Sequence, residues 1–367
     1  MQTCYIAETV TGTVLAQVTP FKYSWNRVLN GAGGGNADFR ISAVGPNLNW
    51  NDLLTPWSRT FVVCEEGVVI YAGLCISRDD DIGSNTISLK HQDIRVLLDR
   101  RSTFGTNGYS GGTPDNKLEL VNITADRLAA WVLWAGTEAP ALANPSFRLP
   151  IIPIAKGTTT GGGTESETYF DYQSTVVGSA MTEAQNRDRG PDIDFLPQWG
   201  PTHKLEYRMR AGTASNPQLT GALLEFNLAT SNHGLVDVKR TVDGKNQATY
   251  IYAVGEGTEA DMKVKTAKNE SFAPALEKFV QYKKIGDETV LQSHADADLK
   301  TYSSPVEQWS YRLQLDSIQY QPLGTLHKLW FEGSPIIETG WHTLRVIGWS
   351  GDETRWVTPV LQPIGSE

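Results

Sequence analysis

The chain has 367 residues, a net charge of −9, 34 glycines, 18 prolines and 11 tryptophans. A chain of this length can bury a large core and usually forms two or three domains. No run of lysine or arginine accompanies the acidic balance, which argues against a protein that coats nucleic acid, and we expect no sequence-specific nucleic-acid binding.

The N-terminus and the cysteines bear on the compartment. The first residues, MQTCYIAETVTG, lack the basic and apolar regions of a signal peptide. No apolar run is long enough to span a bilayer, so we expect no stable membrane insertion. Cys4, Cys64 and Cys75 lack the spacing of a metal site, and the last two lie in apolar, strand-like runs. We therefore expect buried, hydrophobic thiols in a chain that folds in a reducing bacterial cytoplasm.

Residues 1–90 are predicted to form strands that are joined by turns. Two strands flank the glycine-rich segment 30–36, NGAGGGN, and two more flank a hairpin signal at residues 65–67. Asp93 is then expected to cap a short helix. The expected strands are residues 23–29, 37–44, 60–64, 68–72 and 86–90.

Helices are predicted in the middle of the chain. Residues 102–116 are rich in glycine, serine, threonine and asparagine and are typical of a loop. Thr124 is expected to cap a helix that Gly136 ends. Residues 156–167, KGTTTGGGTESE, are of low complexity and are predicted to be mobile. Residues 171–185 are predicted to form a third helix.

The remainder returns to strands, which begin around residues 193–195 and 205–209, with one helix inside. Apolar residues at helical spacing predict a helix over residues 287–303, which ends before Pro305. We expect its apolar stripe to pack on an antiparallel sheet within the same subunit. The stripe consists of Leu291, Ala295, Leu299 and Tyr302.

A strand of near-perfect alternation follows this helix. Its apolar positions alternate with polar ones, which predicts one buried and one wet face. Residues 341–349 are predicted to be a further strand, residues 350–352 a turn, and residues 355–361 the last strand. The apolar positions of the first of these strands are Trp309, Tyr311, Leu313 and Leu315.

Together these elements predict a mainly β fold with α insertions. We expect two antiparallel β-barrel-like domains and a helical or mixed insert, and the similar length of the two β portions allows two related barrels. The expected boundaries are residues 1–105 for the first barrel domain, completed by about residues 200–235, residues 106–199 for the insert with its mobile loop 156–167, and residues 236–367 for the second barrel domain with helix 287–303.

Motifs of catalysis and of metal or phosphate binding are weak. Segment 30–36 is glycine-rich like a phosphate loop, but an alternating strand follows it where such a loop needs a helix, so a hairpin turn is favoured. Residues 79–81, three aspartates, lack the ligand spacing of a calcium loop, and a solvated turn is favoured. Residues 348–351, GWSG, lack the spacing of a nucleophile elbow. The six histidines form no recognised motif: His91, His203, His233, His294, His327 and His342. We expect no catalytic residue, cofactor or metal.

Two further features leave alternatives open. Asp192 and Asp194 flank Ile193, share a strand face and could serve as the acid and base of a glycoside hydrolase, although a solvated strand edge is the favoured interpretation. The abundant tryptophans could form sugar-binding platforms, but at alternating strand positions, as with Trp309, they more often belong to the core.

Segments spread over most of the chain resemble the tail-tip hub, or minor tail, proteins of long, non-contractile-tailed phages that infect actinobacteria. This siphovirus family is related in fold to the baseplate hub of contractile-tailed phages. Each segment alone is weakly specific, whereas their order and spacing together are moderately to strongly specific. The segments are YSWNRVLNGAGGGNADFRIS, TPWSRTFVVCEEGVVIYAGLCIS, ISLKHQDIRVLLDRR, FDYQSTVVGSAM, RGPDIDFLPQW, the unit 287–316, and LRVIGWSGDETRWVTPVL. The glycine-rich turn is longer than the family pattern, and residues 156–167 match no family motif.

The resemblance implies a virion structural protein of the viral tail tip and not an enzyme. Such hubs are homotrimeric rings in which each chain supplies two β-barrels, so that six barrels meet the six-fold tail rings. The implied partners are the distal tail protein ring, the C-terminus of the tape-measure protein and other tail-tip or fibre proteins. Because the chain ends at Glu367 shortly after its last predicted strand, we expect no C-terminal lysin or adhesin extension.

Two other functions remain as alternatives. One is a carbohydrate-binding tail or adhesion module that uses exposed tryptophans, and the other is a cell-wall glycoside hydrolase that uses Asp192 and Asp194. For the hub, we expect a lumen wall that is not strongly basic, because DNA must slide past it without sticking.

Overall fold

The computed structural model describes residues 2–41, 49–103, 116–142, 144–187, 189–231, 233–283, 285–315 and 321–364. The fold is mainly β, with 46% strand and 17% helix, which confirms the predicted fold class of a β protein with α insertions. The chain divides into two compact units: the larger unit comprises Met1–Asp237 and Tyr311–Glu367, and the smaller unit comprises Val238–Ser310. Among the described residues, no helix is both long and apolar enough to cross a bilayer.

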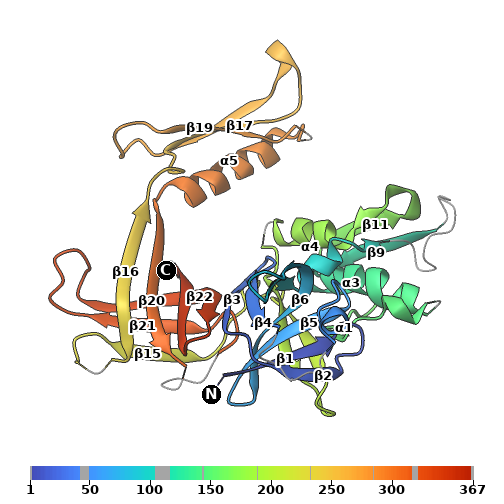
Figure 1. Cartoon of the computed structure of the whole chain (residues 1–367). Helices are drawn as coiled ribbons and strands as arrows, with labels where there is room; N and C mark the ends of the chain where they lie inside the picture. Colours follow the sequence, from blue (N-terminus) through green and yellow to red (C-terminus); the bar gives the residue numbers. More distant parts are fainter. Residues whose placement is uncertain are drawn as a thin grey trace. The chain divides into compact units, whose positions relative to one another are not determined.

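The largest sheet has thirteen strands, which lie in the larger unit except for parts of β16 and β20 that belong to the smaller unit (Figure 1). At one end of the sheet, β16 and β20 lead the chain into and out of the smaller unit. In spatial order the strands are β16 (Leu235–Asp243), β20 (Val306–Gln314), β23 (Trp356–Pro363), β22 (Gly340–Asp352), β3 (Lys22–Val28), β4 (Gly34–Arg40), β7 (Thr86–Asp93), β6 (Val68–Asp81), β5 (Arg59–Glu65), β1 (Gln2–Glu8) and β2 (Val14–Val18); β21 (Leu326–Phe331) also pairs with β22, and β15 (Leu223–Asn227) pairs with β21.

The same strand order occurs twice in this sheet. The first repeat reads β3-β4-β7-β6-β5-β1, and the second repeat reads β16-β20-β23-β22-β21-β15. The long strand of each repeat carries a β-bulge at the matching place, between Cys75 and Ser77 in β6 and between Val346 and Gly348 in β22. One pairing differs, because β1 is antiparallel to β5 whereas β15 is parallel to β21. The doubled order agrees with two related β portions, while closure of each into a barrel stays a prediction.

Strand β22 joins the two repeats. Its residues 340–345 pair with β21, and its residues 348–352 pair antiparallel with β3. Strand β23 occupies the opposite edge of β22. The sheet therefore continues from the second repeat into the first through the β22–β3 pairing, which we call the seam.

The glycine-rich segment enters the sheet and is not only the turn that the sequence predicts. Strand β4 already begins at Gly34 and pairs with β3 and β7. A Cβ atom on Gly35 would lie 1.9 Å from the Ser24 carbonyl oxygen and 2.8 Å from Cε1 of His91. Only glycine permits such a close approach, so sheet packing explains the composition of this segment. The predicted strand over residues 37–44 ends at Arg40, and residues 42–44 lie outside the described part of the chain.

Other predicted elements of the first repeat are confirmed. The turn between β5 and β6 consists of Glu66 and Gly67, which have φ values of 50° and 82°. Two consecutive left-handed residues suit the twist of a tight hairpin. A short helix, α2 (Arg95–Leu98), is present, but its N-cap position is Ile94 and not Asp93 as predicted. The Asp93 side chain still accepts a hydrogen bond from the Arg95 backbone N–H at 3.0 Å.

The insert between the repeats is mixed and differs from its prediction in two helices. Helix α3 (Ala125–Ala141) passes through Gly136 instead of ending there. A Cβ at this position would lie 2.2 Å from Cγ2 of Val177, so close packing and not helix termination explains the glycine. Helix α4 (Val177–Gln185) begins later than predicted, because a short 3-10 turn and strand β12 come first. The remaining elements are α1 (Trp50–Leu53), β8 (Ser102–Thr103), β9 (Lys117–Ile123), η1 (Pro145–Phe147), β10 (Ile151–Ile152), β11 (Glu165–Phe170), η2 (Asp171–Gln173), β12 (Thr175–Val176), β13 (Ile193–Trp199) and β14 (Leu205–Ala211).

Two loops of the insert were singled out by the sequence. Most of the predicted loop 102–116 lies outside the described residues. Two arginines hold the low-complexity segment 156–167. Arg127 donates to the carbonyl oxygens of Lys156, Thr158 and Gly161 at 3.2, 2.6 and 2.9 Å, and Arg187 forms ion pairs with Glu165 and Glu167. The mobility of this segment stays a prediction.

The smaller unit is a three-stranded sheet with one helix on it (Figure 1). Helix α5 (Glu288–Tyr302) confirms the predicted helix, and Asp287 caps it by accepting from the backbone N–H groups of Thr289 and Val290. Leu291 and Ala295 are fully buried, which confirms that the stripe packs within its own subunit. The sheet is mixed and not antiparallel, because its central strand pairs in parallel with one neighbour. Its order is β18 (Val264–Lys268), β17 (Tyr250–Val254) and β19 (Glu277–Gln281), and a 3-10 turn, η3 (Glu259–Asp261), precedes β18.

The C-terminal strands confirm the predicted alternation, but the turn predicted at residues 350–352 comes later in the chain. Trp309, Tyr311 and Leu313 are buried in β20. Strand β22 continues through residues 350–352, which were predicted to form a turn, because these residues pair with β3 and the first two of them also pair with β23. The chain therefore reverses only after Asp352.

Candidate functional site

The carboxylates of Asp192 and Asp194 are buried, and the favoured prediction of a solvated strand edge was wrong. Asp192 is 7% exposed and Asp194 is 5% exposed. Asp192 directly precedes β13 and Asp194 lies within it, so both side chains leave this strand on one face, as predicted. A buried carboxylate needs a charge partner or hydrogen-bond donors, and both kinds of partner surround this pair.

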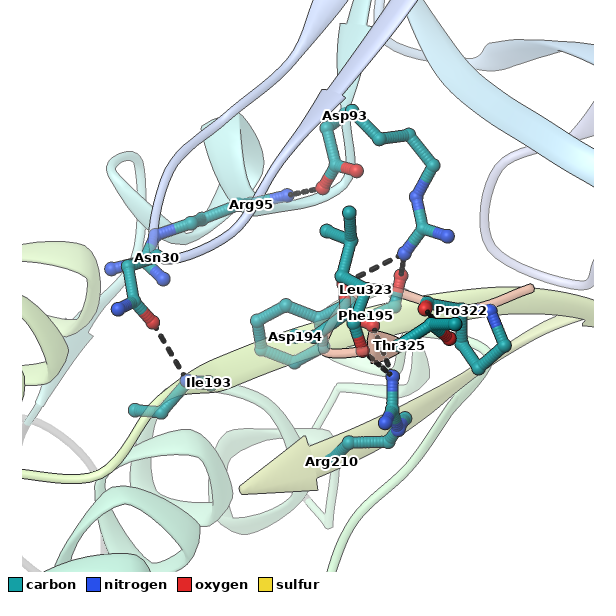
Figure 2. A network of polar contacts seen from close by, with 11 residues as sticks. Asn30, Asp93, Arg95, Ile193, Asp194, Phe195, Arg210, Pro322, Leu323 and Thr325 are labelled. Carbon is teal, nitrogen blue, oxygen red and sulfur yellow. Dashed lines mark hydrogen bonds and ion pairs between the residues drawn. The ribbon is translucent and has the colours of Figure 1, made fainter. Parts of the chain in front are cut away.

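Asp194 binds two arginines from two different sheets (Figure 2). Arg27 of β3 donates from Nη2 to Oδ1 of Asp194 at 2.7 Å and to the Phe195 carbonyl oxygen at 3.2 Å. Arg210 of β14 donates from Nη1 to Oδ2 of Asp194 at 3.2 Å and to the Leu323 carbonyl oxygen at 2.9 Å. Asp194 thus connects the insert to the first repeat, and Arg210 extends the connection to the segment before β21.

Asp192 makes the corresponding connection to the second repeat. Its Oδ2 atom forms an ion pair with Arg345 of β22 and accepts from the Leu219 backbone N–H at 2.9 Å. Its Oδ1 atom accepts from the Asn30 side-chain amide at 2.8 Å. Asn30 in turn accepts from the Ile193 backbone N–H at 2.8 Å, as Figure 2 shows.

A third buried carboxylate, Asp93, lies beside these two. Burial raises the pKa of Asp93 to about 6, and the nearby Arg27 guanidinium opposes that rise. We call Asp93, Asp192 and Asp194, with Arg27, Arg210 and Arg345, the buried polar cluster. Removing one partner of a buried ion pair typically costs about 3–5 kcal/mol, because the other charge is left buried without compensation.

This geometry fits a structural joint and not an acid–base pair. The carboxylate of Asp194 already accepts from two arginines, and that of Asp192 accepts from Arg345, a backbone N–H and a side-chain amide. Neither residue lines any of the described cavities. A glycosidase needs two carboxyl groups that face a substrate-sized space, which this buried and paired arrangement does not provide.

Two histidines are buried beside tyrosines. Tyr71 and His91 share a hydrogen bond of 2.7 Å in the first repeat, and Tyr311 and His327 share one in the second. Burial lowers the pKa of His91 to about 3 and the pKa of His327 to about 4, so both rings are neutral near pH 7. Neither ring has a serine or cysteine nucleophile as its hydrogen-bond partner, in line with a packing role.

The remaining candidates lie apart from this cluster. Asp81 accepts from the Ser84 backbone N–H at 3.0 Å in the β6–β7 turn, and Asp80 pairs with Arg78 at 3.1 Å. Among the residues that the structure describes, no group of three or more acidic, histidine or cysteine side chains could hold a metal. The three cysteines are free and buried, as predicted, and burial raises the pKa of each thiol to about 12.

A polar groove of about 660 Å³ crosses the outward face of the seam. Its lining includes one cationic side chain, Arg312, and one anionic side chain, Asp352. The Arg312 guanidinium lies 5.3 Å from the ring centre of Trp356, which also lines the groove. The other lining side chains are small or uncharged and include Ser24, Asn26, Asn36, Gln92, Ser350 and Thr358.

Sequence reasoning missed the arginines of the buried polar cluster, although one signal was available. Arg27 stands two positions after Trp25 and four after Tyr23, so strand periodicity already assigns it to the buried face. A buried arginine requires an acidic partner. No local pattern could show that this partner would come from residue 194.

Comparison with known proteins shows similarity in structure only. No protein-family model matches the chain, and no curated protein matches it in sequence. Among solved structures, the chain is similar to the tail protein from Neisseria meningitidis MC58, with a TM-score of 0.56, 14% identity and coverage of 98% of this chain and 96% of that one. The prophage MuSo2 43 kDa tail protein from Shewanella oneidensis gives a TM-score of 0.58, 9% identity and coverage of 98% and 96%. Prophage tail protein gp18 from Listeria monocytogenes EGD-e gives a TM-score of 0.50 and 10% identity, with coverage of 98% of this chain and 94% of that one. The chain therefore has, over nearly its whole length, the fold of phage tail proteins.

Proposed function

We propose that the protein is a structural component of a phage tail, the hub of a long, non-contractile tail tip, and that it is not an enzyme. The observation that carries this proposal is the doubled strand order in a chain whose full length shares the fold of tail proteins. The buried polar cluster supports it, because the charged residues of the interior connect the two repeats to the insert instead of facing a substrate.

A chain with two repeats suits a junction between three-fold and six-fold symmetry. Three copies in a ring supply six equivalent repeats, so the ring can meet a six-fold tail tube or distal tail ring on one side. The same ring remains three-fold for the tip and fibre proteins on the other side. Cyclic closure also satisfies strand edges that would otherwise invite aggregation. The proposed partners are two further copies, the distal tail protein ring, the C-terminus of the tape-measure protein and the tip or fibre proteins.

The groove at the seam suits the wall of a channel for DNA. Its lining carries one cation and one anion among uncharged polar groups, so it offers phosphates no cluster of cations. A channel wall of this kind lets DNA pass without sticking. A trimer whose lumen were lined mostly by lysine and arginine would contradict this assignment.

Native mass spectrometry of the purified chain tests the proposal. We expect a trimer of about three times the 40.4 kDa chain mass. A dimer or a tetramer would contradict the hub. Negative-stain images of the same sample are expected to show rings with six-fold pseudosymmetry.

A carbohydrate-binding module is the second candidate, and one observation favours it. Trp341 is 42% exposed and forms an edge-to-face pair with Trp330 at 5.4 Å. An exposed aromatic face is the usual platform for a sugar ring. Saturable binding of a cell-wall glycan that Trp341→Ala abolishes would favour this function, whereas a glycan array without binding would count against it.

A further inference from the structure

We infer that β16 of one copy pairs with the outer half of β6 in the next copy, and that this strand pairing closes the ring. The inference rests on the trimeric ring proposed above and names the surfaces that meet in it. It follows from a pairing that already exists within each chain. The β22–β3 pairing at the seam is the model for the pairing that we propose between chains.

At the seam, β3 of the first repeat pairs with residues 348–352 of β22 in the second repeat. Strand β16 holds the position of β3 in the repeated order, and β6 holds the position of β22. The matching bulges align the two long strands, so residues 77–81 of β6 correspond to residues 348–352 of β22. In the repeated strand order, β16 is therefore equivalent to β3, and residues 77–81 of β6 are equivalent to the part of β22 that pairs with β3 at the seam.

Both of these strand edges are open in the described part of a single chain. Residues 77–81 of β6 pair with β7 on one side, whereas β5 pairs only with residues 68–74 of the same strand. Strand β16 ends the sheet and has β20 as its one described neighbour. An open edge presents unpaired N–H and C=O groups and is a template for another strand. A head-to-tail contact between these edges uses two different surfaces, which is what a closed ring of identical subunits requires.

The side chains on the two edges are complementary in charge. In β6, Asp79 and Asp81 are exposed and stand opposite Ser88 and Thr86 of β7, on the outward face of the sheet. In β16, Lys239 is exposed and alternates with half-buried neighbours, so it also belongs to an outward face. Continuing the sheet from β16 into β6 brings Lys239 of one copy to the acidic stretch of the next.

Strand β16 carries two acidic residues, Asp237 and Asp243, and both are held within the same chain. Asp237 is held by Arg312 at 2.7 Å. Asp243, the last residue of the strand, accepts from the Lys245 backbone N–H at 2.9 Å. Opposite charges across an interface steer association and fix its register. In the complete ring, the seam within each chain and the proposed seam between chains alternate, which gives six junctions of one kind.

The test is a charge reversal with a rescue, measured by native mass spectrometry and sedimentation. Lys239→Glu is expected to raise the concentration at which half of the chains assemble by at least about 10-fold, because it places like charges at each contact. Adding Asp81→Lys to the same chain is expected to restore the trimer. Lys204→Glu, which reverses an exposed charge on a loop, is the matched control and is expected to leave the trimer unchanged.

Cysteine cross-linking gives an independent readout of direction. In a mixture of a Lys239→Cys chain and an Asp81→Cys chain, oxidation is expected to link the two kinds of chain, and either variant alone is expected to stay unlinked. The three native cysteines are buried and do not interfere.

The outcomes separate the two levels of the proposal. A wild-type trimer that persists in Lys239→Glu, with no cross-link in the mixture, would overturn this interface and leave the ring itself standing. A wild-type chain that never forms a trimer would overturn the ring and this interface together.

Discussion

The two repeats of the main sheet share a strand order but differ in what connects their first two strands. In the first repeat, the short glycine-rich segment joins β3 to β4. In the second repeat, the chain leaves β16, builds the smaller unit with its own core, and returns through β20. Insertion at a hairpin tip leaves the ladder hydrogen bonds of both strands intact, so one scaffold can accept a tight turn or an added unit.

The two repeats also differ in how they bind the insert. Asp194 binds Arg27 in the first repeat, and Asp192 binds Arg345 in the second. Asp194 lies in β13 and Asp192 directly precedes this strand, so only one residue separates the two carboxylates in the sequence. We therefore expect both repeats to unfold together with the insert, and four changes test this comparison.

The largest effect is expected from breaking the buried polar cluster. Asp194→Ala leaves Arg27 and Arg210 without their carboxylate, which is expected to cost about 3–5 kcal/mol of unfolding free energy. Asp192→Ala is expected to destabilise to a similar degree through Arg345. Urea unfolding followed by tryptophan fluorescence measures both. Glu138→Ala, at an exposed position on α3, is the control and should change little. A loss below about 1 kcal/mol in Asp194→Ala would refute the role assigned to the cluster.

The next largest effect on stability is expected at the glycine-rich segment of the first repeat, where Gly35 is compared with Gly244 after β16. Gly35→Ala places a Cβ against the Ser24 carbonyl oxygen and the His91 ring, so overpacking is expected to cost about 1–3 kcal/mol. Gly244→Ala, just after β16, meets only the Gln247 side chain at 3.6 Å and should be close to neutral. Thermal unfolding of the two variants compares them directly. Equal stability would show that close packing does not explain the glycine-rich segment.

Acid is expected to weaken both repeats through their buried histidines. The folded pKa values of His91 and His327, about 3 and about 4, lie below the ordinary histidine value. Their contribution to stability is therefore fully present above about pH 6.5 and is lost as the pH falls toward the folded values. Asp93 acts in the opposite sense, because its raised pKa favours the folded state below about pH 4 and this contribution is lost as the pH rises through about 6.

On acidification, the stability lost through His91 and His327 exceeds the stability gained through Asp93, so the folded state becomes less stable. Between pH 7 and pH 5, His327→Phe is expected to lose about 2 kcal/mol less than the wild-type chain. Thermal unfolding across this range measures the difference, with His203→Phe, an exposed position, as the control. The prediction fails if His327→Phe and the wild-type chain have parallel pH profiles.

The smallest effect is expected from removing the inserted unit. Replacing residues 244–303 by Asn-Gly converts the β16–β20 connection into a hairpin like that of the first repeat. Because the smaller unit buries its own core around Leu291 and Ala295, the larger unit should keep its stability to within about 1 kcal/mol. Calorimetry of the shortened chain checks this expectation, and a shortened chain that is insoluble or unfolded would show that the larger unit depends on the insertion.

Local chemistry in the sequence determined much of the secondary structure. The hairpin at Glu66 and Gly67, the helix predicted over residues 287–303 and the alternation from Trp309 to Leu313 each depend on neighbouring residues, and each is present as predicted. Such signals depend on backbone preference and on periodicity, which the sequence displays directly. The buried thiols and the buried stripe of α5 could be predicted for the same reason.

Tertiary structure decided what local signals could not. Gly136 looks like the end of a helix, yet α3 continues through it, and the glycine is there because Val177 packs against it. Residues 350–352 look like a turn, yet they lie in β22 because β3 pairs with them. Asp192 and Asp194 look like a wet edge, yet arginines from residues 27, 210 and 345 neutralise them in the interior. In each case the deciding partner is far away in the sequence, so only the folded chain brings the two together.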